Sequence, residues 1–232
     1  MRVCETDGVF VVVVVAALAA VGGYYFFKYR ARQARIRQVR ALAQRIGFTF
    51  SVDDTERLVD MPFALFTKGD GRTLDLVVGG THNGLPLHMF DFMYYETHSD
   101  GRGNRSRSYY RFTCAVLQIP AACPPLCLSH EDFLTRLGSH IGFHDVELEY
   151  DAFNKRFRVK CNEQKFAFTL LDGGMMQWLL DQDRFEHLEV IGPWVLLARD
   201  QLPPSAWTNL AVWLDGFHAH VPPLVYTSYP RS

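Results

Sequence analysis

Residues 73–95 read TLDLVVGGTHNGLPLHMFDFMYY, two apolar segments separated by the dipeptide Asn83-Gly84. Segments this rich in Val, Leu, Phe and Tyr favour β-strands. Asn-Gly is typical of a type I′ turn, whose two central residues take positive φ and which joins neighbouring antiparallel strands. The stretch therefore predicts a β-hairpin with strands at 73–78 and 85–95.

A third strand is expected at residues 109–119, which are again rich in aromatic and β-branched side chains. The polar, basic segment 98–108 before it is expected to be an exposed loop. The prolines within 120–125 are expected to end the strand. The three strands would form an antiparallel meander. Exposed aromatic side chains are expected at Tyr94, Tyr95, Tyr109 and Tyr110.

The segment 145–161 shows a regular alternation of charge. Acidic residues alternate with apolar ones in its first half, and basic residues alternate with apolar ones in its second half. If 151–154 form a loop, one register places opposite charges on one face of a hairpin and apolar side chains on the other. The predicted pairs are Asp145 with Lys160, Glu147 with Arg158, Glu149 with Arg156, Val146 with Val159 and Leu148 with Phe157. We interpret these carboxylates as part of a solvated salt-bridge ladder, not as a catalytic acid–base pair.

Helices are expected between and after these strands. Ser129 and Asn162 are residue types that favour the N-cap position, and they predict helices at 129–137 and 163–171. A further pair of strands is expected to turn at Gly192-Pro193. The remaining predicted elements are a short helix at 175–180, strands at 185–190 and 194–198, and a last helix at 203–218 with Trp207, Leu210, Leu214 and Phe217 on a core-facing stripe.

The N-terminal part differs from this domain because residues 9–27 (VFVVVVVAALAAVGGYYFF) are apolar and uncharged. At about 1.5 Å per residue they span roughly 28 Å, which matches the hydrocarbon thickness of a bilayer. Tyr24, Tyr25 and Tyr29 lie where interfacial aromatic residues belong. We therefore expect one transmembrane helix. The alternative is a cleaved signal peptide, which the acidic residues before the apolar run disfavour.

Positive charge follows the apolar run, because residues 28–45 carry seven basic side chains and no acidic one. The positive-inside rule then predicts an N-terminus outside the cell and a C-terminal domain in the cytoplasm, in a single-pass protein of the cell membrane. The candidate membrane-surface residues, where anionic lipid could bind, are Lys28, Arg30, Arg32, Arg35, Arg37 and Arg40.

The same segment has helical periodicity, with a narrow apolar stripe that ends at Gly47. The stripe consists of Ile36, Val39, Ala43 and Ile46. Three interpretations stay open: a solvated connector, a helix lying on anionic lipid, and a helix that pairs with a second copy of itself.

These features together predict an α+β protein, with one N-terminal transmembrane helix followed by a single domain of antiparallel sheet and several packed helices. The expected divisions are a short tail at 1–8, the transmembrane helix at 9–27, a basic juxtamembrane helix at 28–47, a soluble α+β domain at 48–225 and a C-terminal tail at 226–232.

The charge of the expected domain disfavours nucleic acid as a partner. Residues 46–232 hold 16 basic and 23 acidic side chains, whereas neutralisation of phosphates by basic residues supplies most of the affinity for nucleic acid. The five cysteines are scattered and are expected to be reduced in the cytoplasm. Cys123 and Cys127 are spaced CxxxC, and no second pair completes a zinc site.

The common catalytic and nucleotide-binding motifs are missing from the sequence. It contains no GxSxG, no GxxxxGK[ST] and no GxGxxG, so neither a catalytic residue nor a cofactor is predicted. Among nine histidines, the close pairs are His140 with His144 and His218 with His220. The candidate metal ligands are His140, His144 and Cys161, against the alternative that these histidines are solvated or lie in the core.

The chain also resembles a known family in several aromatic and structural motifs. These are Gly79-Gly80, Phe90-Asp91-Phe92 with Tyr94, the run Phe153-Asn154-Lys155-Arg156-Phe157-Arg158-Val159, and Ala167 with Leu170-Leu171. They resemble a family of bacterial, actinobacterial-type, membrane-anchored proteins of unknown function. The resemblance implies one or two N-terminal membrane helices and a single α+β domain, and it carries over no catalytic residue.

Two main functional hypotheses follow, of which the first is favoured, and a third is kept beside them. One is a non-enzymatic, membrane-tethered binding or scaffold module at the cytoplasmic face, which holds a protein partner, a lipid head group or a second copy of the chain. The other is a membrane-bound hydrolase with a metal site built on His140 and His144. A third hypothesis is a homo-oligomeric scaffold assembled through the anchor.

Overall fold

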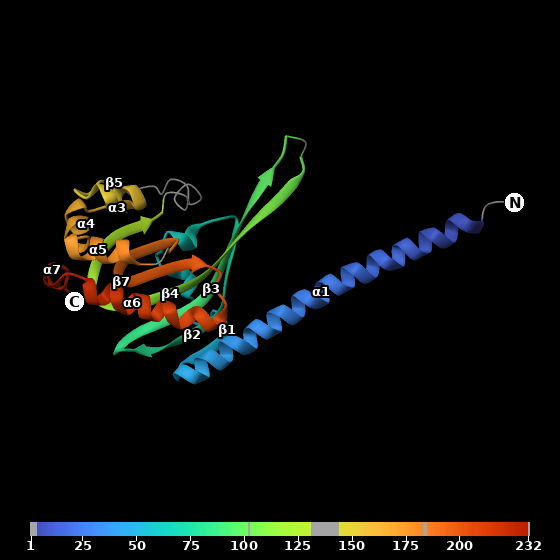
Figure 1. Cartoon of the computed structure of the whole chain (residues 1–232), viewed down its shortest axis with the longest axis horizontal. Coiled ribbons are helices and arrows are strands. Elements are labelled where there is room, and N and C mark those ends of the chain that lie inside the picture. Colours follow the sequence, from blue (N-terminus) through green and yellow to red (C-terminus); the bar gives the residue numbers. More distant parts are fainter. Residues whose placement is uncertain (1–3, 102, 131–143, 183–184, 232) are drawn as a thin grey trace.

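Strand pairing organises the domain. Within residues 4–101, 103–130, 144–182 and 185–231, which this computed structural model describes, seven strands form one antiparallel sheet (Figure 1). The side chains of residues 4–14 and 17 lie outside the described part. The order is β1-β2-β3-β4-β6-β5, and β7 also pairs with β4. The strands are β1 (Thr49–Asp53), β2 (Gly71–His82), β3 (Leu85–Ser99), β4 (Arg105–Ser129), β5 (His144–Val146), β6 (Arg158–Cys161) and β7 (His187–Asp200).

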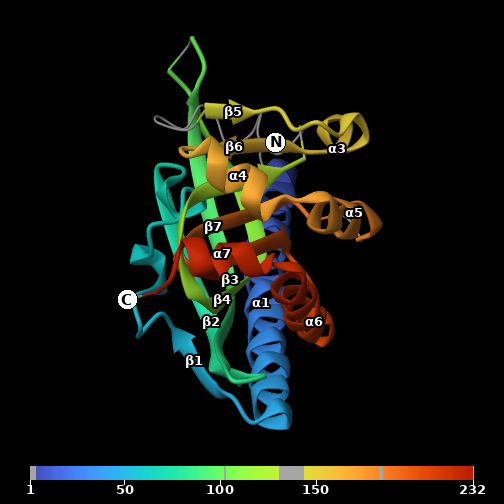
Figure 2. The same ribbon diagram turned by 90° about the vertical axis from the view of Figure 1, so that its left-hand side faces the viewer.

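Helices and the segment 54–68 cover opposite faces of the sheet (Figure 2). The larger core, on the helix side, includes Val39, Met89 and Trp207. The smaller, aromatic core on the other side includes Phe66 and Phe92, whose ring centroids are 4.9 Å apart. The helices are α1 (Cys4–Ile46), α3 (Asp151–Arg156), α4 (Gln164–Leu170), α5 (Gly173–Asp181), α6 (Trp207–His220) and α7 (Pro223–Ser228), with 3-10 turns η1 (Leu58–Asp60), η2 (Leu65–Thr67) and η3 (Pro204–Ala206). The predicted α+β class, with an antiparallel sheet and several helices, is confirmed.

The predicted first hairpin is confirmed. Asn83 and Gly84 both take positive φ, 49° and 83°, and join β2 to β3 as a type I′ turn requires. The meander of β2, β3 and β4 is also present. However, the predicted loop at 98–108 is wrong over most of its length, because β3 and β4 pair out to Ser99 and Arg105.

Two predicted interruptions of the sheet are wrong. β4 continues through Pro120–Pro125, and β7 continues through Gly192-Pro193 instead of forming two strands. Cys123 lies opposite Gly192, and the register shifts on both sides of this pair. Because the irregularities of the two strands lie opposite each other, the strands bend together and stay paired.

The predicted register of the charged hairpin is confirmed at its base. Asp145 pairs with Lys160 and Val146 pairs with Val159. The expected loop, however, is the helix α3, so β5 ends at Val146 and the other predicted pairs are not part of the ladder. Arg156 instead donates hydrogen bonds to the carbonyl oxygens of Leu180 and Gln182.

The expected N-caps differ from those in the structure. Ser129 ends β4, and the helix predicted after it falls at 131–143, outside the described residues. Glu163, not Asn162, is the N-cap of α4. Asp172, directly after the helix predicted at 163–171, is the N-cap of α5 and accepts a hydrogen bond from the backbone N–H of Met175. The core-facing stripe on α6 is confirmed, since Trp207, Leu210, Leu214 and Phe217 are buried.

α1 is one helix from Cys4 to Ile46, and its C-terminal third packs on the sheet. Val39 and Ala43 are fully buried against the larger core, and Ile36 and Ile46 pack at its edge. The apolar stripe therefore covers the sheet, which none of the three interpretations anticipated. Beyond the stripe, the helix extends away from the domain (Figure 1).

Within the part of the chain that the structure describes, no helix combines the length and the apolar character needed to cross a membrane. The described residues thus do not support the predicted transmembrane helix at 9–27. Seven of its positions, 9–14 and 17, have side chains outside the described part.

Candidate functional site

The junction between α1 and the sheet is built around Asp91 of β3. Asp91 lies among residues that face the larger core, and its side chain is almost fully buried. Arg35 of α1 forms a two-pronged ion pair with it, Nε to Oδ2 at 2.6 Å and Nη2 to Oδ1 at 2.7 Å. Arg35 also donates to the carbonyl oxygen of Leu202, 2.8 Å away. A planar guanidinium held in this way fixes both the position and the rotation of the helix.

A second ion pair lies one helical turn away. Arg32 Nη2 is 3.0 Å from Asp75 Oδ2, and Asp75 is the direct neighbour of Asp91 across β2 and β3. Burial raises the pKa of Asp75, and the carboxylate of Asp91 adds to this, while Arg32 opposes it. Two adjacent carboxylates on one sheet face are thus balanced by two arginines on one helix face. We call Arg32, Arg35, Asp75 and Asp91 the helix junction.

Further hydrogen bonds hold the Asp91 carboxylate in place. Thr113 on β4 donates to Oδ1 at 3.1 Å, and Gln201 donates to Oδ2 at 3.3 Å. The Thr113 hydroxyl in turn accepts from the backbone N–H of Leu202 at 2.9 Å. The junction therefore links α1, the centre of the sheet and the segment before α6, which suits a rigid attachment.

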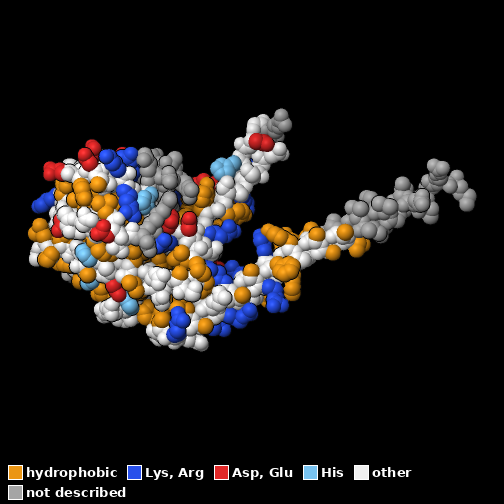
Figure 3. Space-filling model, in the orientation of Figure 1, with side chains coloured by type: hydrophobic (Ala, Val, Ile, Leu, Met, Phe, Trp, Pro, Cys, Tyr) orange, Lys and Arg blue, Asp and Glu red, His pale blue; other side chains and the backbone are white. Residues whose placement is uncertain are grey.

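The six predicted membrane-surface residues fall into three groups. Arg35 and Arg32 belong to the helix junction. Lys28 lies over the ring of Tyr24 at 4.7 Å, and Arg30 lies 5.7 Å from that of Phe26, so both are on the part of α1 that extends from the domain. Figure 3 shows Lys and Arg side chains gathered along this helix where it leaves the domain. The other two are Arg37, which is exposed, and Arg40, which lies over the ring of Phe50.

A buried polar cluster joins β4 and β7 to η2. Ser129 Oγ is hydrogen-bonded to His187 Nδ1, and His187 Nε2 is 2.6 Å from Glu189 Oε1. The two Glu189 oxygens also accept from the backbone N–H groups of Ala64 and Leu65, at 2.6 and 2.7 Å. Burial alone would raise the pKa of Glu189, but the charge and hydrogen bond of His187 and these two N–H groups hold it below its usual value.

The cluster has the composition of a catalytic triad or a metal site, but its geometry favours a structural role. The ligand atoms of Cys127, His187 and Glu189 lie within 4.8 Å of one another. All three side chains are buried, both carboxylate oxygens already accept hydrogen bonds, and burial raises the pKa of the Cys127 thiol far above its usual value. A substrate or metal would have to displace these bonds, so we interpret the cluster as an internal link.

The predicted metal ligands are only partly described. His140 lies outside the described residues. His144 is exposed on β5, opposite Cys161 of β6. Cys161 is buried, and its thiol donates to the carbonyl oxygen of Glu163 at 3.1 Å. Among the described residues, the side chains that do come together in a ligand-like group are those of Cys127, His187 and Glu189.

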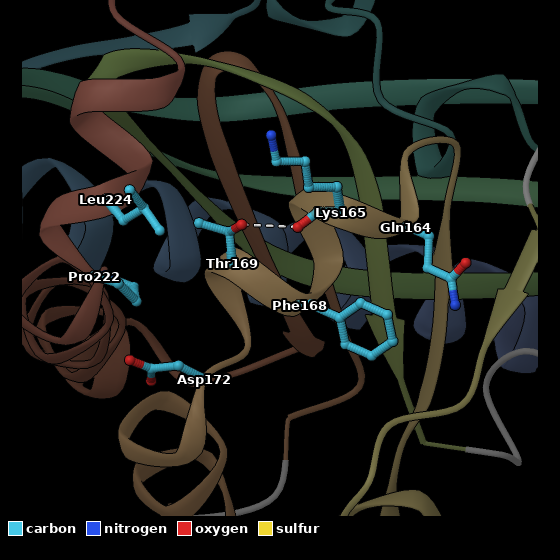
Figure 4. Close-up of a pocket in the computed structure, with 7 residues that line it drawn as sticks. All are labelled: Gln164, Lys165, Phe168, Thr169, Asp172, Pro222 and Leu224. Atoms are coloured by element: carbon cyan, nitrogen blue, oxygen red, sulfur yellow. Dashed lines mark hydrogen bonds between the residues drawn. The ribbon is translucent and has the colours of Figure 1, made fainter.

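An open groove lies between α4 and α7 (Figure 4). Its volume is about 590 Å³. Phe168 and Leu224, both exposed, face this space from the two helices. Polar atoms sit at its rim, where Thr169 donates to the carbonyl oxygen of Lys165 at 2.8 Å. The lining residues are Gln164, Lys165, Phe168, Thr169, Asp172, Pro222 and Leu224, a set suited to apolar contact and without an activated nucleophile.

Sequence reasoning missed the helix junction. Asp91 is one of the residues that carry the family resemblance, but no sequence pattern points to its partner. A carboxylate at a core-facing position of an apolar strand indicates a buried counter-ion. Nothing local singles out Arg35 among the arginines of α1, because the two residues are 56 positions apart.

Comparison with known proteins identifies a similar fold. No family model and no curated protein sequence matches the chain. Among solved structures, the crystal structure of the mycobacterial trehalose monomycolate transport factor A, TtfA, is similar, with a TM-score of 0.59 and 16% sequence identity. The match covers 80% of this chain and 93% of that one. At this identity the likeness shows a shared fold.

Proposed function

We propose that the chain is a non-enzymatic binding or scaffold module tethered to the cell membrane through residues 9–27. The observation that carries this proposal is the difference in environment between the two parts of α1. Its C-terminal third is packed and ion-paired to the sheet, whereas Leu18, Tyr25 and Phe27 expose most of their side chains. Apolar side chains exposed around a helix need another environment than water. With the uncharged sequence of 9–27, that environment would be the bilayer.

The orientation proposed for the tether has the domain in the cytoplasm. The basic residues from 28 to 45 support this orientation, because such clusters stay on the cytoplasmic side. Lys28 and Arg30 would lie at the head groups, as would Arg37 and Arg40 if the helix tilts.

The kind of function proposed is that of an accessory factor in transport. The similar structure is that of a transport factor for trehalose monomycolate. A single membrane helix offers no closed path for a solute, so a protein with one tether would contribute by binding a partner or a lipid head group. The structural role assigned to the Ser129–His187–Glu189 cluster agrees with a function without catalysis.

The experiment that tests the tether is cysteine labelling in cells with a membrane-impermeant thiol reagent. Cys114, Cys123, Cys127 and Cys161 are buried, and burial raises the pKa of Cys123 to about 12, so the native domain should give little background. The variant carries Cys4→Ser and Ser106→Cys, which places one thiol on the exposed tip of the β3–β4 hairpin.

The unmodified chain, with its thiol at Cys4, is the matched control. We expect Cys4 to react in intact cells and Ser106→Cys to react only after the cells are opened. The reverse pattern would overturn the orientation. Recovery of the chain in the soluble fraction, rather than with the membranes, would overturn the tether.

A further inference from the structure

The β3–β4 hairpin extends beyond the rest of the sheet. Pairing of β2 with β3 reaches Tyr95, and pairing of β7 with β4 reaches Phe112. From Glu96 outward, β3 and β4 continue to pair as far as Ser99 and Arg105. Figure 1 shows this hairpin as an arm that leaves the domain on the same side as the part of α1 that extends away from the domain.

The two faces of the arm differ in charge. Residues that pair directly lie on the same face, so the odd-numbered residues of β3 and β4 form one face and the even-numbered residues form the other. The odd face carries Arg105, Arg107 and Arg111 with Tyr95 and Tyr109, and we call these five residues the hairpin face. At positions 93–99 and 105–111, all of them described, the odd face has no acidic side chain of its own, and the neighbouring acid is Asp70, whose Oδ2 accepts a hydrogen bond from the backbone N–H of Thr97 at 2.7 Å. The one carboxylate within these positions, Glu96, is on the even face.

The hairpin face continues the side of the sheet on which α1 packs. Asp91 and Thr113 are further odd-numbered residues of the same two strands, and Asp91 binds Arg35 of α1. From this junction the helix runs outward through Arg32 to Lys28, while the arm runs outward through Arg111 to its tip. The helix and the arm thus diverge like the sides of a V (Figure 1). Figure 3 shows Lys and Arg side chains along the helix and at the inner end of this V.

Aromatic rings hold two of the three arginines of the hairpin face, Arg107 and Arg111. The Arg107 guanidinium lies 4.6 Å from the ring centre of Tyr95, and that of Arg111 lies 5.4 Å from the ring centre of Tyr109. The two tyrosine rings are 5.7 Å apart, and Tyr109 exposes 47% of its surface. Stacked guanidinium groups keep their N–H donors available for phosphate oxygens, and tyrosine is enriched at the head-group level of bilayers.

We propose that the hairpin face is a second contact with the bilayer, which binds the phosphate groups of anionic lipids. The proposal rests on the tether proposed above. With α1 crossing the bilayer, an arm that diverges from it turns its helix-facing side toward the membrane surface. That side is the one on which the arginines lie. The helix would fix the domain at one point and the arm at another, so the domain would hold a defined tilt on the membrane.

The test uses the full chain in lipid nanodiscs with a fluorophore on the arm. The labelled variant carries Cys4→Ser and Ser99→Cys, since Ser99 is exposed on the odd side of the tip. One set of nanodiscs contains phosphatidylcholine alone, and the other equal parts of phosphatidylcholine and phosphatidylglycerol. Quenching by a head-group spin label reports proximity to the surface. We expect clearly stronger quenching in the anionic nanodiscs.

Replacing Arg105, Arg107 and Arg111 with serine should remove this difference. Each basic residue near an anionic surface raises the bound population about fivefold, so three together should lower the ratio of bound to free arm on the order of 100-fold. The matched control replaces three exposed basic residues on other elements, and it should leave the quenching unchanged. These residues are Arg57, Lys155 and Lys165.

The outcomes separate the two proposals. If the chain enters nanodiscs and the Ser99→Cys label is quenched equally in both lipids, or is unaffected by the arginine substitutions, the hairpin contact is overturned and the tether stands. If the chain does not co-elute with nanodiscs, the tether itself is overturned. A label at Gln177→Cys, on the exposed surface of α5, should remain unquenched, and quenching there would contradict the orientation of the domain.

Discussion

Removing the carboxylate of Asp91 should loosen the attachment of α1 to the sheet. This carboxylate accepts two hydrogen bonds from Arg35 and one each from Thr113 and Gln201. Asp91→Ala leaves the Arg35 guanidinium, whose side chain is 21% exposed, without its counter-ion. Breaking a fully buried pair in this way costs about 3–5 kcal/mol, and the partial exposure of Arg35 places our expectation near the lower end, at about 3 kcal/mol.

The assay is thermal unfolding of the full chain in detergent micelles, followed by circular dichroism. For a protein of this size, each kcal/mol of lost stability lowers Tm by about 2–4 °C, so Asp91→Ala should melt about 6–12 °C below the unmodified chain. Arg37→Met removes an exposed arginine from the same helix and is the matched control. Its Tm should change by less than about 2 °C.

A double-mutant cycle separates the ion pair from other effects of the substitutions. Arg35→Met and Asp91→Ala should each be destabilising, and the combined variant should lose about 2 kcal/mol less than the two single losses together. If the single effects add to within about 0.5 kcal/mol, the two side chains do not depend on each other. That result would refute the interpretation of the helix junction as a rigid attachment of α1 to the sheet.

Three further substitutions test other parts of the structure. Because the pKa of Glu189 is lowered, its carboxylate stabilises the fold at neutral pH and loses this contribution below about pH 4.5; Glu189→Gln should therefore flatten the fall in urea stability between about pH 5 and 3. Gly80→Ala places a Cβ 2.6 Å from the ring of Phe48 and should cost about 1–3 kcal/mol in the same assay, whereas Gly101→Ala meets nothing within 4 Å and is its control. Gly84→Ala should cost about 1 kcal/mol, since φ is +83° there.

Local patterns predicted those parts of the fold that depend on neighbouring residues. Asn83-Gly84 predicted its turn because few other dipeptides tolerate positive φ twice. The prediction that the strand ends at Pro120–Pro125 was wrong, although prolines in a strand usually end it. Here the ladder with β3 ends at Leu117 and that with β6 begins at Leu126, so the prolines lie where a missing N–H on that edge of β4 breaks neither ladder.

The candidate sites depend on contacts that no local pattern contains. The hairpin face requires β3 and β4 to pair beyond Tyr95, in a segment whose polar composition is typical of a loop. The apolar stripe of α1 was recognised, but whether it faces lipid, a second copy or the sheet depends on the tertiary fold. Tyr94 was expected to be exposed and is buried, because its ring stacks on Tyr110 at 4.8 Å within the aromatic core.

Because α1 is one unbroken helix, the number of residues between the proposed membrane segment and the domain determines how far the domain is rotated about the helix axis. Each residue inserted between Tyr29 and Arg32 would rotate the domain by about 100° relative to the proposed membrane segment and displace it by about 1.5 Å. A protein partner that binds both the membrane segment and the domain would no longer bind both after two insertions. It would bind both again at about seven insertions, where the rotation of the domain returns to within about 20° of its original value. A contact between the domain and lipid would not depend on the rotation of the domain about the helix axis. It would weaken steadily as the insertions move the domain away from the membrane. The periodicity of an insertion series would thus distinguish a protein partner from a lipid surface.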